Sequence, residues 1–160
     1  MFSQTSTTGK YEGQMKDSKR CGAGHLLTPM GDLIVARFEN DKVHGKGAVY
    51  FTDGNYFEGE LENDKASKGK LFYKNGNVYE GSFQDNLPNG TGKLSFSDGR
   101  RYEGGFQRGQ RHGQGSYNWT DGSHYEGLWE NGNQHGHGKH TDKSGKVTEG
   151  DFFQGKLLKA

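Results

Sequence analysis

The sequence has a single cysteine, almost no net charge and no long hydrophobic run. Cys21 alone cannot form an intrachain disulfide, which excludes a disulfide-based secreted fold and favours a reducing compartment. The 21 Lys and Arg residues nearly balance the 20 Asp and Glu residues, so no general attraction to nucleic acid is predicted. No segment approaches the roughly 20 apolar residues of a membrane span, and residues 1–10 lack a signal-peptide core. We therefore expect a soluble cytoplasmic protein.

Apolar residues are also scarce, at 28% of the chain, and the mean hydropathy is -1.08. Glycine, in contrast, accounts for 28 of the 160 residues, and aromatic residues make up 12%. A helical bundle is disfavoured, because glycine in a helix interior costs up to about 1 kcal/mol relative to alanine. A disordered chain is disfavoured because such chains are poor in aromatic residues. The length suffices for one folded domain.

A short motif, Tyr-Glu-Gly followed two residues later by an aromatic residue, recurs along the chain in more or less altered form. It starts at residues 11, 34, 57, 79, 102, 125 and 148, at intervals of 23 residues except for one of 22 after residue 57. Three further glycines, two of them in a Gly-x-Gly pair, keep the same register in most repeats. We divide the chain into an N-terminal stub at 1–10, six repeats at 11–147, and a C-terminal half-repeat and cap at 148–160.

Each repeat is predicted to form two strands. Side chains alternate between the faces of a strand, so Tyr79, Gly81 and Phe83 share one face. Pairs such as Asn131-Gly132 tolerate positive φ and are expected to turn the chain between the two strands. A ring is expected to lie over the bare backbone that a glycine leaves. With no helix pattern to cover the sheet, the expected fold is all-β, an elongated single antiparallel β-meander of successive hairpins.

The order Tyr-Glu-Gly-x-Phe/Trp, then His-Gly-x-Gly, then Asp-Gly resembles the MORN repeat, most faithfully in its middle element at residues 44–47, 112–115 and 135–138. The similarity covers about residues 11 to 155, although Cys21 replaces the histidine of the first repeat. The resemblance implies MORN-type hairpins and a scaffold or adaptor without catalytic activity. Such a protein would be a structural subunit that binds other proteins in a larger cytoskeletal or ciliary assembly.

Candidate chemical sites are few. His135, His137 and His140 raise the question of a metal site, but zinc needs four suitably placed ligands and His135 occupies the ordinary histidine place of the motif. The Gly-x-Gly pairs do not lead into a helix, unlike phosphate-binding loops. Cys21 is followed by His25 without a recognisable orienting carboxylate. We predict no metal, no cofactor and no enzyme activity.

One candidate binding surface is the face that carries the rings. A single sheet has no second layer, so these rings are predicted to form an apolar groove that takes a partner helix. The simpler interpretation, that the rings only pack against one another, stays open. The predicted groove residues are Tyr79, Phe83, Tyr102, Phe106, Tyr125 and Trp129.

The alternative function is that of a peripheral membrane module that binds acidic phospholipids through clustered basic residues. On the polar face, the glutamates at the second place of most repeats are expected to form weak cross-strand pairs with lysines instead. The candidate lipid-binding residues are Lys19, Arg20, Arg100, Arg101, Arg108 and Arg111.

Overall fold

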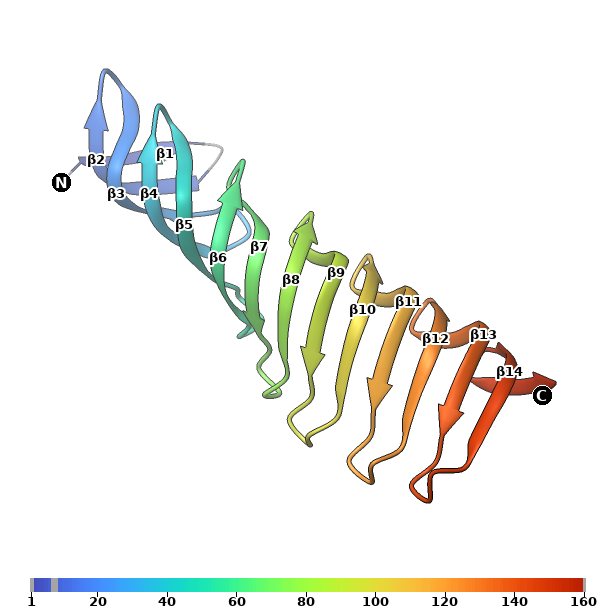
Figure 1. The fold of residues 1–160 in the computed structure, drawn as a ribbon. Helices are drawn as coiled ribbons and strands as arrows, with labels where there is room; N and C mark the ends of the chain where they lie inside the picture. Colours follow the sequence, from blue (N-terminus) through green and yellow to red (C-terminus); the bar gives the residue numbers. More distant parts are fainter. Residues whose placement is uncertain (1, 7–8, 160) are drawn as a thin grey trace. The chain divides into compact units, whose positions relative to one another are not determined.

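The computed structural model describes residues 2–6 and 9–159, and over these ranges the chain forms β-strands and turns and no helix (Figure 1). The predicted terminal segments include residues 1, 7, 8 and 160, which lie outside the described residues. Within the described part, no helix is long and apolar enough to cross a membrane. The prediction of an all-β antiparallel meander is confirmed.

The chain forms two compact units, Met1–Lys74 with Gln84–Asn86 and Asn75–Phe83 with Leu87–Ala160. Inside each unit, every strand is hydrogen-bonded to its neighbours in the sequence. The strands of the first unit are β1 (Phe2–Ser6), β2 (Gly9–Lys16), β3 (Lys19–Leu27), β4 (Leu33–Glu39), β5 (Lys42–Tyr50), β6 (Tyr56–Glu62) and β7 (Lys65–Phe72). Those centred on the second unit are β8 (Val78–Gln84), β9 (Leu87–Ser95), β10 (Arg101–Gln107), β11 (Gln110–Asn118), β12 (His124–Glu130), β13 (Asn133–Thr141), β14 (Val147–Phe153) and β15 (Lys156–Lys159).

Two-residue turns connect the strands of each hairpin from β2 to β15. Both turn residues have positive φ, as in a type I′ turn, whose twist matches that of the flanking strands. The predicted turn at Asn131-Gly132 is among them, with φ of 49° and 83°. The turns from β2 to β15 are Asp17-Ser18, Asn40-Asp41, Asn63-Asp64, Asp85-Asn86, Arg108-Gly109, Asn131-Gly132 and Gln154-Gly155.

The Asp-Gly pairs and Asn75-Gly76 lie in five-residue loops between hairpins. In the loop at 119–123, the Trp119 amide donates to the Ser123 carbonyl at 2.9 Å, and Gly122 has a φ of 91°. The Asp121 carboxylate accepts the Ser123 amide at 2.9 Å and its hydroxyl at 2.5 Å. These hydrogen bonds hold the pKa of Asp121 below its usual value. Side-chain hydrogen bonds and a glycine with positive φ therefore both stabilise the conformation of this loop.

The two glycines of a Gly-x-Gly pair have different tasks. The register of β10 and β11 shifts between Gly104 and Phe106, and Gly113 of β11, opposite this bulge, has a φ of 75°. Gly115 instead lies under the ring of Tyr102, where a Cβ atom would be 2.2 Å from the phenol oxygen. The first glycine supplies a left-handed backbone, and the second leaves room for a ring.

The core follows from this arrangement. Rings of alternate strands cover the glycines on one face of the sheet and meet edge to face. In the second unit the ring centroids lie 4.9 Å apart for Tyr79 and Phe106, 5.4 Å for Tyr102 and Trp129, and 5.2 Å for Tyr125 and Phe152. A continuous row of rings thus packs on one face, and the other face is left to polar and exposed side chains.

Candidate functional site

The six residues predicted to form a groove come from β8, β10 and β12, and all six are buried. None has more than 9% of its surface exposed, and Tyr79 and Tyr125 have 0%. Their edge-to-face contacts and the bare glycines beneath them account for this burial. A partner could reach them only if these rings separated. The burial favours the interpretation that they pack the sheet, and their role in binding remains a prediction.

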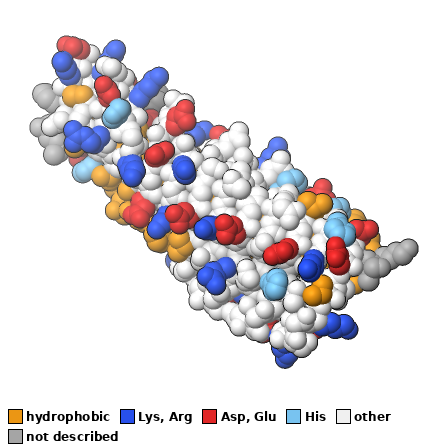
Figure 2. All heavy atoms as spheres, viewed as in Figure 1, with side chains coloured by type: hydrophobic (Ala, Val, Ile, Leu, Met, Phe, Trp, Pro, Cys, Tyr) orange, Lys and Arg blue, Asp and Glu red, His pale blue; other side chains and the backbone are white. Residues whose placement is uncertain are grey.

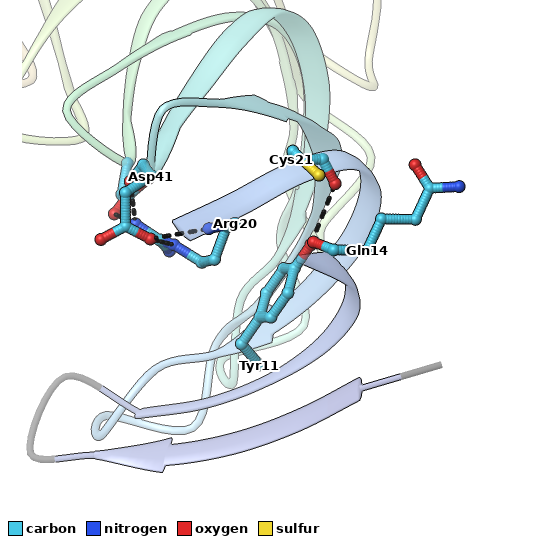
Figure 3. Close-up of polar contacts among 6 residues, drawn as sticks. Tyr11, Gln14, Arg20, Cys21 and Asp41 are labelled. Atoms are coloured by element: carbon cyan, nitrogen blue, oxygen red, sulfur yellow. Dashed lines mark hydrogen bonds and ion pairs between the residues drawn. The ribbon is translucent and has the colours of Figure 1, made fainter. Parts of the chain in front are cut away.

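Hydrogen bonds fix the tyrosines in place. The Tyr102 hydroxyl donates to the Gly105 carbonyl at 2.8 Å, and desolvation raises the pKa of Tyr102 to about 12. The same contact recurs in the first unit, where the Tyr11 hydroxyl donates to the Gln14 carbonyl at 2.9 Å (Figure 3). Each such bond satisfies a carbonyl next to the bulge of its hairpin. The hydroxyls are therefore part of the fold.

A shallow hollow of ≈ 270 Å³ remains beside this core. Its walls include Tyr117, Trp119 and Trp129, with ring centroids 4.6 Å apart for Tyr117 and Trp119. The Arg111 guanidinium lies 4.7 Å from the centroid of the Trp129 ring and donates to the Gly132 carbonyl at 2.7 Å. Arg111 and Trp129, predicted for two different surfaces, thus meet in one packing contact.

The six candidate lipid-binding residues do not form one cluster. Lys19 and Arg20 belong to the first unit and the other four to the second. Within the second, Arg100 and Arg101 lie at one end of β10 and Arg108 and Arg111 near the other, because β10 runs from Arg101 to Gln107.

Three of these guanidinium groups already have partners. Arg20 Nε contacts Asp41 at 2.8 Å (Figure 3), and its guanidinium also lies 4.8 Å from the centroid of the Phe38 ring. Arg100 Nε contacts Asp98 at 2.8 Å, and Arg111 stacks as described above. Lys19, Arg101 and Arg108 are exposed. The structure therefore offers scattered cations where acidic headgroups would require a cluster.

Three of the seven histidines contact carboxylates. Glu39 contacts His44 at 3.0 Å and Glu130 contacts His135 at 3.2 Å, each within one hairpin. Among the described residues, no group of three or more His, Cys, Asp or Glu side chains is placed to hold a metal ion. His137 differs from the others in facing two carboxylates, Glu149 at 3.0 Å and Asp151 at 3.5 Å.

The His137 contacts predict a pH effect. The hydrogen bond with Glu149 is the largest cause that raises the pKa of His137 above 6.5, and Asp151 adds to it. A group whose pKa is raised by folding contributes its full stabilisation when the pH is below its unfolded-state pKa. This stabilisation is lost as the pH rises through its folded-state pKa. Glu149→Gln should therefore lower the pKa of His137, measured by NMR titration, and destabilise the protein at pH about 5 but not at pH about 9. Asp151→Asn should act in the same direction to a smaller extent, and a wild-type pKa at or below 6.5 would contradict this prediction.

The outward face carries the predicted row of charges (Figure 2). Lys93 Nζ lies 3.8 Å from the Glu103 carboxylate, and the strand register places Lys139 opposite both Glu126 and Glu149. The register thus places these glutamates opposite lysines, and Lys93 with Glu103 forms one of the expected cross-strand pairs. Such exposed pairs contribute little, roughly 0.2–1 kcal/mol each.

Sequence reasoning missed an apolar row on this outward face, which we call the outer strip. One residue from each of five adjacent strands contributes to it, and consecutive members are direct partners in the strand register. The sequence contains these apolar residues at two recurring places. One is the residue just before a repeat start, and the other is the last residue of the second strand of a hairpin. The outer strip consists of Leu27, Leu33, Tyr50, Tyr56 and Phe72.

Comparison with known proteins identifies the repeat. A family model described as MORN repeat matches residues 11–33, 36–56, 57–78, 79–100, 102–124 and 125–147. No curated protein gives a match.

Some solved structures are similar at low identity. The TCP domain of SAS-4 (dCPAP) from Drosophila melanogaster, in complex with a proline-rich motif of Ana2 (dSTIL), is 12% identical with a TM-score of 0.38, over 80% of this chain and 83% of that chain. The wild-type TCP10 domain of Danio rerio CPAP is 17% identical with a TM-score of 0.34, over 86% and 71% of the two chains.

Proposed function

Because this chain belongs to the MORN repeat family, a family of non-enzymatic repeat modules, we propose that it is a scaffold or adaptor without catalytic activity. In this role it is a structural subunit that binds other proteins in a larger cytoskeletal or ciliary assembly of the cytoplasm. Membership of a family of repeat modules supports the general proposal of protein binding. The cytoskeletal or ciliary assembly is the more specific part of the proposal.

The observation that carries this proposal is that the two faces of the sheet differ in the exposure of their apolar side chains. The inward rings are buried against one another, whereas several apolar side chains on the outward face are exposed to solvent. Tyr50 is 50% exposed, Leu27 43% and Leu128 41%. Burial of apolar surface is the main driving force for protein association, so exposed apolar groups on a finished fold favour an interaction role.

Cell fractionation tests the proposed assembly. An epitope-tagged full chain, expressed in ciliated cells, should remain mostly in the detergent-insoluble cytoskeletal and axonemal fraction. An unrelated soluble protein of similar size serves as the control and should be extracted. Complete extraction by detergent would contradict the cytoskeletal role.

Two further measurements test the phospholipid alternative. Flotation of the chain with membranes before extraction, and salt-sensitive sedimentation with phosphoinositide vesicles, would favour that alternative. We expect neither, because Arg20, Arg100 and Arg111 are engaged in contacts within the fold. Charge reversal of the exposed Arg101 and Arg108 should leave the fractionation unchanged.

A further inference from the structure

The outer strip lies on a regular part of the sheet, with Leu27 and Tyr50 exposed and its other three members half-buried. Its three rings lean on one another, with centroids 4.9 Å apart for Tyr50 and Tyr56 and 5.8 Å for Tyr56 and Phe72. Tyr50 and Leu27 keep 50% and 43% of their surfaces exposed. Hydrophobic side chains accordingly gather along the margin of the first unit in Figure 2. The strip is therefore a continuous apolar surface and not a set of isolated residues.

The second unit provides an internal control. On β9–β13 of the second unit, the positions that correspond to the outer strip carry polar residues, which are likewise direct partners in the register, and Val147 of β14 follows them as a single apolar residue. The same hairpins thus form without apolar groups at this row, so the fold does not require them. The corresponding residues are Ser95, Arg101, Asn118, His124 and Thr141.

The charge beside the row also differs between the units. On β4–β7 the exposed charged residues on the face of the outer strip, within four places of it along their strands, are four cations and two carboxylates, Arg37, Lys46, Lys68, Lys70, Glu58 and Glu60. On β9–β13, which carry the corresponding row of the second unit, these positions hold two carboxylates, Glu103 and Glu126, and two cations, Lys93 and Lys139. Only the first unit therefore combines an apolar strip with a basic border.

The direction of the strip limits what can cover it. It runs across the strands, whose spacing of about 4.8 Å gives it a length of roughly 19 Å over five strands. An α-helix of about 13 residues has this length, and its pitch of 5.4 Å brings about one side chain per turn to each strand. An added β-strand would need unpaired backbone groups, but β3–β6 are paired on both sides. A second copy of the chain would bring the same basic border instead of an acidic one.

From these observations we infer that the outer strip is the docking site of an amphipathic partner helix, whose apolar stripe is bordered on one side by Asp and Glu. The apolar contacts supply the affinity, and the basic border of β4–β7 sets the orientation. This inference rests on the proposed scaffold function and names one of its binding surfaces. It places the helix on the face of the first unit that points away from the buried rings of Tyr11, Phe38 and Phe57.

A synthetic peptide tests the inference with the full chain. The probe is a fluorescein-labelled, 18-residue helical peptide with a leucine stripe at helical spacing and glutamates along one border. The matched peptide has lysine in place of each glutamate. Fluorescence anisotropy should show micromolar binding of the glutamate peptide, weakened by salt, and about tenfold weaker binding of the lysine peptide.

Variants then locate the site. The double variant Tyr50→Asn, Tyr56→His copies Asn118 and His124 of the second unit and should weaken binding of the glutamate peptide by about tenfold or more. Val147→Thr is the matched control, because Val147 lies in the corresponding row of the second unit and is 49% exposed. This control should bind the peptide like the wild type. Circular dichroism should show that both variants keep the wild-type fold.

Several outcomes would overturn the inference. These are failure of the glutamate peptide to bind, equal or tighter binding of the lysine peptide, or full binding by the Tyr50→Asn, Tyr56→His variant. If sedimentation equilibrium shows that the wild type is a dimer and this variant a monomer, the strip joins two copies of the chain. Loss of vesicle binding in this variant would show that the strip contacts a membrane. If the peptide fails but the chain stays in the cytoskeletal fraction, the docking site is rejected and the scaffold function stands.

Discussion

Tyr102→Ala should lower the free energy of unfolding of the second unit by about 3–5 kcal/mol, the range for large aromatic residues in cores. The Tyr102 ring is 1% exposed and contacts the rings of Phe106 and Trp129 edge to face. Its removal would open a cavity over two bare glycines, Gly104 and Gly115, which have no side chains to fill it. The loss should therefore lie at the upper end of this range.

Urea unfolding followed by tryptophan fluorescence measures this effect. Both tryptophans of the chain, Trp119 and Trp129, lie in the second unit and report on its unfolding. Tyr102→Phe, which loses only the hydrogen bond to Gly105, should cost about 0.5–1.5 kcal/mol. Leu128→Ala, at an exposed position of the same unit, should cost about 0.5 kcal/mol or less. Equal effects of Tyr102→Ala and Leu128→Ala would contradict the assignment of Tyr102 to the core.

Gly115→Ala should be nearly as damaging, although it adds a single methyl group. The added Cβ would lie 2.2 Å from the oxygen and 2.5 Å from the Cζ atom of Tyr102, so the ring would have to leave its place. Overpacking of this kind costs about 1–3 kcal/mol, and we expect about 3 kcal/mol because the ring is held on all sides. The same urea experiment measures this loss.

A double-mutant cycle identifies the cause. If Tyr102 is the obstacle, Gly115→Ala should cost little in a chain that already carries Tyr102→Ala. Gly113→Ala is the control, because a Cβ there meets no atom within 4 Å but the backbone has a φ of 75°. Its cost of about 1–2 kcal/mol should stem from backbone strain and persist in the Tyr102→Ala background. Additive costs for Gly115→Ala and Tyr102→Ala would contradict the proposed packing.

The sequence allowed the fold to be predicted because local signals agree with one another. Pairs such as Asn40-Asp41 tolerate the left-handed conformation that a two-residue hairpin needs, and they fix where each hairpin turns. Between the turns, the alternation in segments such as Tyr79 to Phe83 fixes which side chains share a face. These rules depend on neighbours in the sequence, so no knowledge of distant contacts was needed.

The candidate site could not be predicted in the same way. Whether Tyr102 is exposed depends on the twist of the sheet and on the rings of the next hairpin, Trp129 among them, which alternation does not reveal. The outer strip escaped notice because Leu33 and Tyr56 stand one place before the repeat motif and look like linker residues. Their alignment with Tyr50 and Phe72 follows from the strand register, which the bulges shift. An interaction surface built across strands thus emerges only once the hairpins are aligned.

The central claim is that the outward face binds partners and the inward rings hold the sheet together. Fluorine NMR of the chain labelled with 3-fluorotyrosine tests it directly, because its eight tyrosines report on both faces. On addition of the glutamate peptide, the resonances of Tyr50 and Tyr56 should shift, whereas those of Tyr102 and Tyr125 should stay in place. Shifts centred on Tyr102 and Tyr125, with Tyr50 and Tyr56 unchanged, would contradict the claim and place the binding site in the aromatic groove.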